Sequence, residues 1–214
     1  MDEKFAIVVG TCDKHSYLWG GWWHYFKKNW DCDCPIYFLN EKKDCTLPVK
    51  QIKVNIPEID LWTKRIRESV EQIPEEDIFF ITEDAFIVQK FKPGEFENIY
   101  RMFKTLNADA LRIKVAKSKY TTLHPTMFKA NGVTINKLDN HSKYLIAFTP
   151  NIWKRSFLLE CLKHDESIWV NETKGSRRVE GKCNVYSYLK PGWWGNACRK
   201  GKTTPEGEKL LRYG

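Results

Sequence analysis

The sequence predicts an α/β fold on a largely parallel central sheet, and two stretches of the chain carry this prediction. A strand at 5–11, a helical stretch at 15–30 and a strand at 35–39 form a βαβ unit, which favours parallel pairing. The run Ile78–Ile81 is apolar at every position, as expected for a strand at the centre of a parallel sheet. The chain has 214 residues, so we expect a single domain over 1–214, either complete or cut from a longer multidomain chain.

Further elements follow from apolar periodicity and proline positions. Apolar residues recur every three or four positions in 61–73, which predicts a helix that Pro74 ends. A second helical pattern covers 94–106. Pro150 suits a first helical position, so a helix is expected after a strand at 144–148. The remaining predictions are strands at 85–88, 110–115 and 185–189, of which 185–189 is the last strand of the chain, and a long loop over 117–141.

Composition narrows the class of protein. Hydrophobic residues make up 42% and charged residues 29%, which is ordinary for a globular chain and argues against disorder. No apolar run approaches the ~20 residues that cross a bilayer, and the first residues lack the pattern of a signal peptide. We therefore expect a cytoplasmic protein without membrane insertion, in the host-cell cytoplasm if it is viral. No C-x-x-C pair or His spacing suggests a zinc site, so the seven cysteines are expected to be reduced thiols.

The formal net charge of +8 is concentrated near the carboxyl terminus. From residue 174 onward there are ten Lys and Arg against three Glu, a balance of +7. This excess is either a solvated basic surface or a patch that meets anions, such as a nucleotide diphosphate, a nucleic acid or an acidic glycan.

The strongest chemical signal is the pair Glu83 and Asp84, which follows Thr82 at the end of the apolar strand. In open α/β sheets, ligands bind beyond the carboxyl ends of the strands. Two carboxylates there need a cation, a basic partner or water, because unpaired buried charge is costly. A divalent metal that bridges diphosphate oxygens would supply the cation. The alternative is a strand that simply runs into a polar loop.

Two weaker signals lie nearby in the predicted fold. The turn with Gly10, Thr11 and Asp13 follows the first strand and either presents N–H groups and a carboxylate to a nucleotide or is an ordinary turn. It is not a Gly-rich phosphate loop. Trp62 and Arg65 lie one turn apart on a helix, where they suit a flat base or sugar face and a phosphate, respectively. Trp62 fits the apolar stripe of that helix equally well.

A last signal is the segment Glu166–Glu172 and the basic residues after it. A carboxylate beside an aromatic ring could deprotonate a sugar hydroxyl. The same residues are equally typical of the end of a surface helix. Lys174, Arg177, Arg178 and Lys182 either offset charge on a leaving diphosphate or an acidic acceptor, or only keep the surface solvated.

Taken in order, these motifs resemble a family of GT-A glycosyltransferases from bacteria and large viruses, including viruses that infect chlorella. The resemblance covers most of residues 5–195 and is specific as a set, although each motif alone is weak. Its parts are Ile7–Lys14 with Tyr17–Trp19, Trp62–Arg65, Ile73–Phe86, Tyr144–Leu158 and Glu166–Glu172.

The resemblance implies one Rossmann-like GT-A domain with a mixed central sheet flanked by helices and a site for a nucleotide sugar with Mn²⁺ or Mg²⁺. Thr82-Glu83-Asp84 falls where the family has an Asp-x-Asp-like motif, with Thr82 in place of the first Asp, and Ile168 replaces a usual Pro. Asp84, helped by Glu83, would hold the metal. Uridine is the common base of this class, so UDP-glucose is the default donor, with a UDP-rhamnose-type sugar as the alternative.

The resemblance also suggests roles for other residues. Thr11 and Asp13 would contact the nucleoside and Arg65 the phosphates, while Trp153 and Trp169 lie on the side of a glycan or glycoprotein acceptor. We hypothesise an inverting transfer with Glu172 as the base, because it matches the last Glu of the family element Glu-Ser-Pro-Trp-x-x-Glu. Asp165 and Glu166 are the reserve bases.

Two other functions stay open from the sequence. A nucleotidyltransferase or nucleotide-sugar hydrolase would keep the metal site and need no acceptor pocket. A non-enzymatic module that binds polyanions or glycans would use the basic tail and the Trp residues. The second function leaves the acidic pair unexplained, so we expect no nucleic-acid partner.

Overall fold

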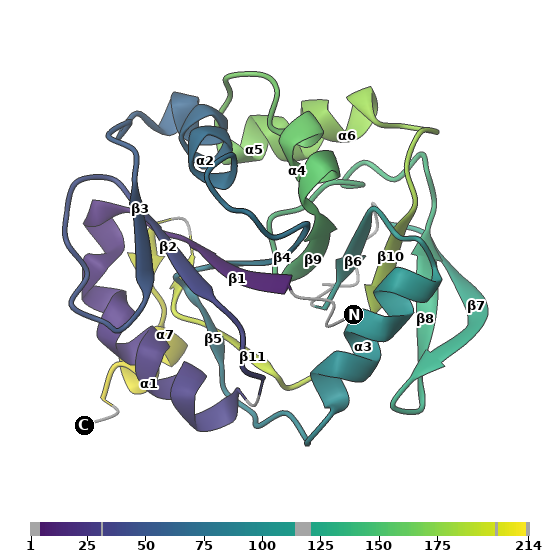
Figure 1. Ribbon diagram of the computed structural model, residues 1–214, viewed down its shortest axis with the longest axis horizontal. Helices are drawn as coiled ribbons and strands as arrows, with labels where there is room; N and C mark the ends of the chain where they lie inside the picture. The colour runs from purple at the N-terminus through teal and green to yellow at the C-terminus, as the bar shows by residue number, and fades with distance from the viewer. Residues whose placement is uncertain (1–4, 31, 114–120, 200, 213–214) are drawn as a thin grey trace.

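The computed structural model describes residues 5–30, 32–113, 121–199 and 201–212, and a nine-stranded sheet runs through its centre (Figure 1). The strand order is β3-β2-β1-β4-β9-β6-β10-β8-β7. In chain order these strands are β1 (Phe5–Gly10), β2 (Ile36–Asn40), β3 (Lys50–Lys53), β4 (Asp77–Thr82), β6 (Ala110–Arg112), β7 (Leu123–Ala130), β8 (Val133–Leu138), β9 (Asn151–Lys154) and β10 (Val185–Tyr188).

The sheet is mixed, but most of its strands share one direction. β1 pairs in parallel with β2 and β4, β2 with β3, and β6 with β10. β9 is antiparallel to β4 and β6, and β8 is antiparallel to β10 and β7. Of the nine strands, β8 and β9 therefore run against the other seven. This confirms the predicted α/β fold with a mixed, largely parallel sheet flanked by helices.

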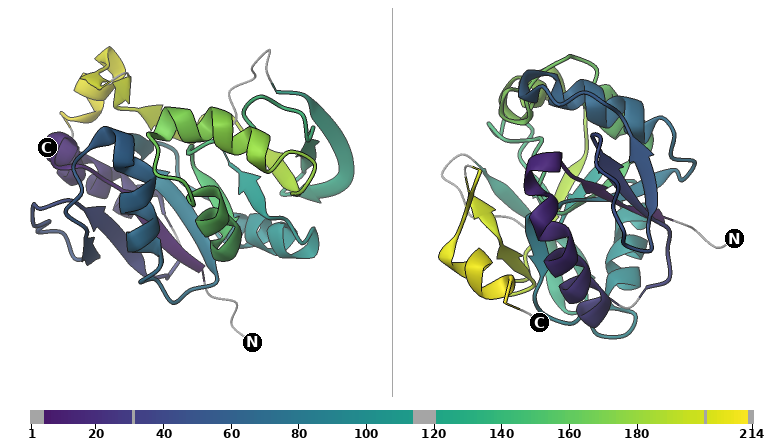
Figure 2. Two further views of the ribbon diagram at one scale, coloured as in Figure 1. Left: turned by 90° about the horizontal axis from the view of Figure 1, so that it is seen from above. Right: turned by 90° about the vertical axis from the view of Figure 1, so that its left-hand side faces the viewer.

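Helices cover both faces of the sheet (Figure 1). One layer holds α2 (Trp62–Val70), α4 (Arg155–Cys161), α5 (Ile168–Val170) and α6 (Ser176–Arg178). The other holds α1 (Trp19–Asn29) and α3 (Glu95–Thr105), with α7 (Pro205–Leu210) on the same side (Figures 1 and 2).

Alternation along β4 joins these layers to the sheet. Phe79 packs toward α3, with its ring 4.8 Å from that of Phe96. The next residue, Phe80, points to the other face, with its ring 6.3 Å from that of Trp62 on α2. All of β4 from Asp77 to Ile81 is buried, so its apolar sequence is explained by a helix layer on each side.

Shorter elements complete the chain. A 3₁₀ helix at Asp13–Leu18 leads directly into α1, which runs without interruption through Gly20 and Gly21. The prediction that 185–189 is the last strand is wrong, since three short strands and α7 follow it. The other short elements are a 3₁₀ helix (Ile59–Leu61), β5 (Ala85–Ile87), a π-helical turn (Asn171–Gly175), β11 (Trp194–Asn196), β12 (Cys198–Arg199) and β13 (Lys202–Thr203).

The predicted loop over 117–141 is wrong at 123–138, where two strands form, and its first four residues lie outside the described residues. β7 and β8 form an antiparallel hairpin in which Ala130 pairs with Val133. The two residues between them are Asn131-Gly132, a dipeptide typical of two-residue hairpin turns. β7 is mostly solvent-exposed, so its sequence does not alternate between apolar and polar residues and did not predict a strand.

The strand expected at 144–148 is also wrong, because that segment is irregular. The strand is β9, immediately after Pro150, and the helix begins only at Arg155. Ile152 and Trp153 are both buried, on opposite faces of the sheet, which is a strand pattern rather than a helical stripe. The strand expected at 110–115 is β6 up to Arg112, and 114–115 lie outside the described residues.

Within the described residues, no helix combines the length and the apolar character that crossing a membrane requires.

Candidate functional site

A cavity of about 1070 Å³ lies beyond the carboxyl ends of β1 and β4. Its walls come from the turns after these strands, the segment 56–59, the start of α2, the segment 148–150 and the start of α5. Three residues of the carboxyl-terminal segment, Asn196, Cys198 and Gly201, complete it. A cavity of this size accommodates a ligand as large as a nucleotide sugar.

Strand register brings the two main turns together. Gly10 of β1 is paired with Thr82 of β4, so both strands end at the same level. The N–H of Glu83 donates to the carbonyl of Gly10 at 3.2 Å. A Cβ on Gly10 would lie 2.7 Å from the Phe80 ring, so only glycine allows this close packing beneath the site.

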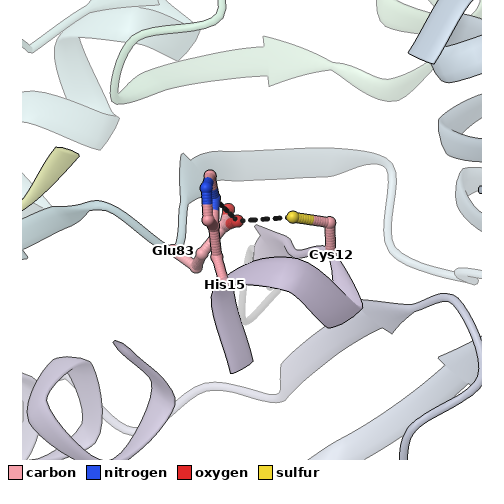
Figure 3. A group of neighbouring side chains, drawn as sticks. All are labelled: Cys12, His15 and Glu83. Atoms are coloured by element: carbon pink, nitrogen blue, oxygen red, sulfur yellow. Dashed lines mark hydrogen bonds and ion pairs between the residues drawn. The ribbon is translucent and has the colours of Figure 1, made fainter. Parts of the chain in front are cut away.

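Glu83 is buried in the cavity wall and faces two side chains of the first turn (Figure 3). Its Oε1 lies 3.0 Å from Nδ1 of His15 and accepts the Cys12 thiol at 3.4 Å. Hydrogen bonding with Cys12 and Glu83 raises the pKa of His15 to about 10, against the opposing effect of burial. His15 is therefore an imidazolium at neutral pH, and it neutralises the Glu83 carboxylate.

Asp84 also lines the cavity, and Thr82 orients it. The Thr82 hydroxyl donates to Oδ1 of Asp84 at 2.6 Å. The Asp84 carbonyl accepts the N–H of Ala197 at 2.8 Å, which ties this turn to the carboxyl-terminal segment. Two successive carboxylates in the wall of a cavity provide the hard oxygen ligands that suit Mn²⁺ or Mg²⁺.

Thr11 and Arg65 line the cavity, but their polar groups already have partners inside the protein. The Thr11 hydroxyl donates to the Leu39 carbonyl at 3.0 Å. Nη1 of the buried Arg65 donates to the Thr11 carbonyl at 2.5 Å and lies 3.6 Å from Oε1 of Glu41. The Arg65 guanidinium thus fixes the turn after β1 in place.

Asp13 lies in the same turn but outside the lining of the cavity. Its carboxylate accepts the N–H groups of Lys42 and Lys43 at 3.3 and 3.1 Å. Its own N–H donates to Oε2 of Glu41 at 2.8 Å. The structure therefore shows Asp13 bracing the turn against the segment after β2.

The three tryptophans of interest occupy different positions. Trp62 is buried in the cavity wall, with its ring 4.7 Å from that of Phe148. Trp169 also lines the cavity, and its side chain is 62% exposed. Trp153 lies in the core behind the cavity and stacks on Phe148 at 5.9 Å.

Glu172 does not line the cavity but is hydrogen-bonded to a residue that does. Its Oε1 accepts the N–H of Phe148 at 2.9 Å, and Phe148 lines the cavity whereas Glu172 does not. Burial raises the pKa of Glu172, although the Phe148 N–H and the nearby positive charge of Arg112 oppose the shift. A carboxylate with a raised pKa accepts a proton more readily.

The reserve bases are held by ion pairs. Glu166 makes a two-pronged contact with Arg178, at 2.9 Å to Nη1 and 2.6 Å to Nη2, and this lowers the pKa of Glu166. Asp165 pairs with Nη2 of Arg67 at 2.9 Å. Burial thus raises the pKa of Glu172, whereas the contact with Arg178 lowers the pKa of Glu166.

The basic residues predicted to meet anions lie outside the cavity lining. Lys174, Arg177 and Lys182 are exposed, and Arg178 is held by Glu166. Instead, Lys14 of the first turn lines the cavity, and the sequence analysis did not single it out.

Cys12 and His15 were missed as well. A Cys and a His three positions apart, directly after a buried strand, were the available signal. Their third partner, Glu83, lies about 70 residues further along the chain, so spacing alone could not assemble the group.

Comparison with known proteins gives the fold. No protein-family model matches the sequence, and no curated protein matches it. Among solved structures, residues 1–349 of S. aureus TarS in complex with UDP match at a TM-score of 0.59 and 14% identity, over 89% of this chain and 59% of that one. The same TarS fragment in complex with UDP-GlcNAc matches at 0.60 and 12%, over 94% and 60%.

A UDP-glucose pyrophosphorylase complexed with UDP-glucose matches at a TM-score of 0.54 and 10% identity, over 98% of this chain and 96% of that one. This chain thus spans less than two thirds of the TarS chains and nearly all of the pyrophosphorylase chain. These three structures contain UDP, UDP-GlcNAc and UDP-glucose, respectively. This chain has the mixed α/β fold of those nucleotide-binding domains.

Proposed function

We propose that the protein is a glycosyltransferase that moves a hexose from a nucleotide-diphosphate sugar to a hydroxyl of a glycan or glycoprotein. The observation that carries this proposal is the cavity at the carboxyl ends of β1 and β4, with Glu83 and Asp84 in its wall and Trp62 and Trp169 beside it. Carboxylates for a metal diphosphate and aromatic faces for a base or sugar are the groups that such a donor needs.

The donor is proposed to be a UDP-sugar, with UDP-glucose first and a UDP-rhamnose-type sugar second. TarS was solved with UDP and UDP-GlcNAc, and the pyrophosphorylase with UDP-glucose. The shared part of these ligands is uridine diphosphate. Thr11, Arg65 and the neighbouring Asp13 remain the candidates for shaping the nucleotide side of the cavity, and Lys14 joins them as a cation that faces it.

Asp84, helped by Glu83, is proposed to hold Mn²⁺ or Mg²⁺ against the donor diphosphate. When bound, the cation would offset the negative charge that grows on the leaving diphosphate. Thr82 keeps the Asp84 carboxylate in place through its hydrogen bond. Arg65 keeps the opposite turn in place through the Thr11 carbonyl.

Glu172 is proposed to be the base of an inverting displacement. The acceptor hydroxyl attacks the anomeric carbon as its bond to the diphosphate breaks, and its proton passes to Glu172. To do so, the Glu172 carboxylate would leave the N–H of Phe148 and turn into the cavity, where Trp169 offers an exposed ring for the acceptor sugar. Lys174 and Arg177 remain candidates for binding an acidic acceptor.

A nucleotidyltransferase is the second candidate, because the pyrophosphorylase match covers 96% of that chain. Such an enzyme would join UTP and a sugar 1-phosphate to form a UDP-sugar and pyrophosphate. Incubation with UTP and glucose 1-phosphate tests it, since pyrophosphate would appear without any acceptor.

The test of the proposed function begins with a thermal-shift screen of nucleotide sugars with Mn²⁺. A true donor binds the native state alone. At 100 times its Kd it adds about 3 kcal/mol of stability, and Tm rises accordingly. The best donor is then incubated with candidate acceptors. We expect release of UDP that depends on an acceptor. UDP release with water alone would identify a hydrolase, and no stabilisation by any nucleotide sugar would contradict the proposal.

A further inference from the structure

Cys12, His15 and Glu83 form a cluster of three different ligand types in the cavity wall (Figure 3). One sulfur, one imidazole nitrogen and one carboxylate oxygen all lie within 4.8 Å of one another. The side chain of Glu83 is 8% exposed and that of His15 is 18% exposed, so both groups are largely removed from water.

The spacing of these atoms is close to that of ligands around one metal ion. Bonds of about 2.0–2.3 Å at a tetrahedral angle place neighbouring N, O and S ligands about 3.4–3.6 Å apart. Oε1 of Glu83 lies 3.4 Å from the Cys12 sulfur and 3.0 Å from Nδ1 of His15. Two of the three ligand separations are therefore close to those around one ion, and the third, between the Cys12 sulfur and the His15 nitrogen, is at most 4.8 Å.

The backbone holds the three ligands in this arrangement. The N–H of His15 donates to the Cys12 carbonyl at 3.1 Å, so the first turn of the 3₁₀ helix presents both side chains to one side. The Glu83 N–H is bonded to Gly10 at the end of the neighbouring strand. Ligands on rigid elements need little reorganisation to bind an ion.

We propose that Cys12, His15 and Glu83 form a three-ligand site for a borderline transition metal such as Zn²⁺ or Co²⁺. Thiolate and imidazole ligands suit these ions and do not suit Mg²⁺. Three protein ligands leave a fourth position, which would face the cavity and accept an anionic oxygen of a ligand bound there. On binding, the Cys12 thiol and the His15 imidazolium each release a proton to solvent.

The proposal adds to the proposed function, because it places a second, softer cation beside Asp84 in the donor cavity. Oε1 of Glu83 would then serve this site. Asp84 would remain the carboxylate for Mn²⁺ or Mg²⁺.

Titration with Co²⁺ in the absence of nucleotide tests the site. A cobalt ion bound by a thiolate in tetrahedral geometry gives a charge-transfer band in the near ultraviolet and intense visible bands. We expect one equivalent to bind with both signatures. Cys12→Ser should abolish the charge-transfer band, and His15→Gln should weaken binding by at least about tenfold.

Cys198→Ser is the matched control. This thiol also lines the cavity, but its sulfur contacts the Tyr17 hydroxyl at 3.4 Å and is not part of the cluster. The control should keep the charge-transfer band, and thermal unfolding of Cys12→Ser checks that the variant is folded. Absence of the band in the native protein, or its survival in Cys12→Ser, would overturn the proposal.

Binding of UDP-sugar with Mn²⁺ is measured separately on the same proteins. If the native protein binds UDP-sugar but gives no cobalt band, the metal site is wrong and the proposed function stands. If it gives the band but binds no nucleotide sugar, the proposed function is wrong and the metal site stands.

Discussion

Thr82 stands where the resembling family has the first Asp of its acidic motif, and it has its own role in this structure. Its hydroxyl donates to Oδ1 of Asp84 at 2.6 Å, in the wall of the cavity. A neutral hydroxyl cannot replace the charge of a carboxylate, but it restricts Asp84 to one orientation. Thr82 thus adds a positioning contact to the acidic turn and carries no charge of its own.

Thr82→Val tests this positioning role, since valine keeps the shape and loses the hydroxyl. We expect metal-dependent UDP-sugar binding to weaken about fivefold, the equivalent of roughly 1 kcal/mol for one hydrogen bond. Thr82→Ser, which keeps the donor, should bind as the native protein does. Calorimetric titration measures both, and equal weakening in the two variants would contradict the role.

Burial raises the pKa of Glu172, whereas the contact with Arg178 lowers the pKa of Glu166. Glu172→Gln keeps an oxygen that can accept the N–H of Phe148, so the fold and donor binding should be unchanged. The amide cannot take up the acceptor proton, and turnover should fall by about 10²–10⁴. Rate assays with saturating donor measure this.

NMR of the anomeric proton in the product tests the stereochemical course. Inversion agrees with a single displacement that uses Glu172 as base. Retention of the donor configuration, or near-normal turnover of the Gln variant, would remove Glu172 from this role.

At the scale of elements, the segment 166–178 is notable for a π-helical turn between α5 and α6. Such turns disturb the helical ladder and occur often at functional sites. The ion pair of Glu166 with Arg178 spans this turn and fastens its two ends. The segment carries both Trp169 at the cavity rim and Glu172 behind it.

Glu166→Gln should therefore destabilise the protein at neutral pH by about 1–2 kcal/mol. The pKa of Glu166 is lowered in the folded state, so its stabilisation is present above the unfolded value of about 4.5 and is lost as pH falls below it. Denaturant unfolding of both proteins at pH 7 and at pH 3 should show a difference that shrinks in acid.

Arg177→Gln provides the matched control for the ion pair. Arg177 is exposed, whereas its neighbour Arg178 is bonded to Glu166. We expect Arg178→Gln to destabilise as Glu166→Gln does and Arg177→Gln to leave stability within about 0.5 kcal/mol. Equal effects of the two Arg variants would show that the ion pair has no special role.

The carboxyl-terminal helix α7 is docked through Gly207. A Cβ there would lie 2.1 Å from the carbonyl oxygen of Ala197, so backbone would have to move. Gly207→Ala should cost about 1–3 kcal/mol of unfolding free energy. Glu208→Ala, an exposed position on the same helix, is the control and should be nearly neutral in denaturant unfolding. If the two variants are equally stable, α7 is not held by this close approach.

An element could be predicted from the sequence only where its burial produces a recognisable pattern of apolar residues. β1 and the central residues Ile78–Ile81 of β4 are apolar because both faces of these strands are covered. β7 is mostly exposed, so it leaves little alternation, and only the Asn131-Gly132 dipeptide marked its turn. β9 was mistaken for a helix because Pro150 precedes it. Ile152 and Trp153 are buried on opposite faces of the sheet, and this burial exists only once the neighbouring strands are in place.

At the scale of the whole molecule, the cavity brings together segments from the first and last parts of the chain. The general rule that ligands bind at the carboxyl ends of strands placed the turns after β1 and β4 correctly at one edge. Side-chain direction could not be predicted in this way. Arg65 turns to the Thr11 carbonyl, and Glu83 to Cys12 and His15, because partners remote in sequence meet them in the fold.

The carboxyl-terminal segment closes one side of this cavity. The N–H of Ala197 donates to the Asp84 carbonyl, and β11 pairs with β5, which follows the acidic turn directly. The basic segment from residue 174 onward therefore contributes Asn196, Cys198 and Gly201 to the described lining of the cavity. The exposed Lys174 and Arg177 lie outside the cavity lining.

The most direct test of the central claim is calorimetric titration of UDP-glucose, with and without Mn²⁺, into the native protein and into Asp84→Asn. The variant keeps the shape of the side chain and loses its charge, and thermal unfolding confirms that it is folded. We predict binding by the native protein that requires Mn²⁺, and a loss of at least about tenfold in affinity in the variant. Equal Mn²⁺-dependent affinities in the two proteins, or no binding of any nucleotide sugar by the native protein, would contradict a metal-assisted nucleotide-sugar site at Asp84.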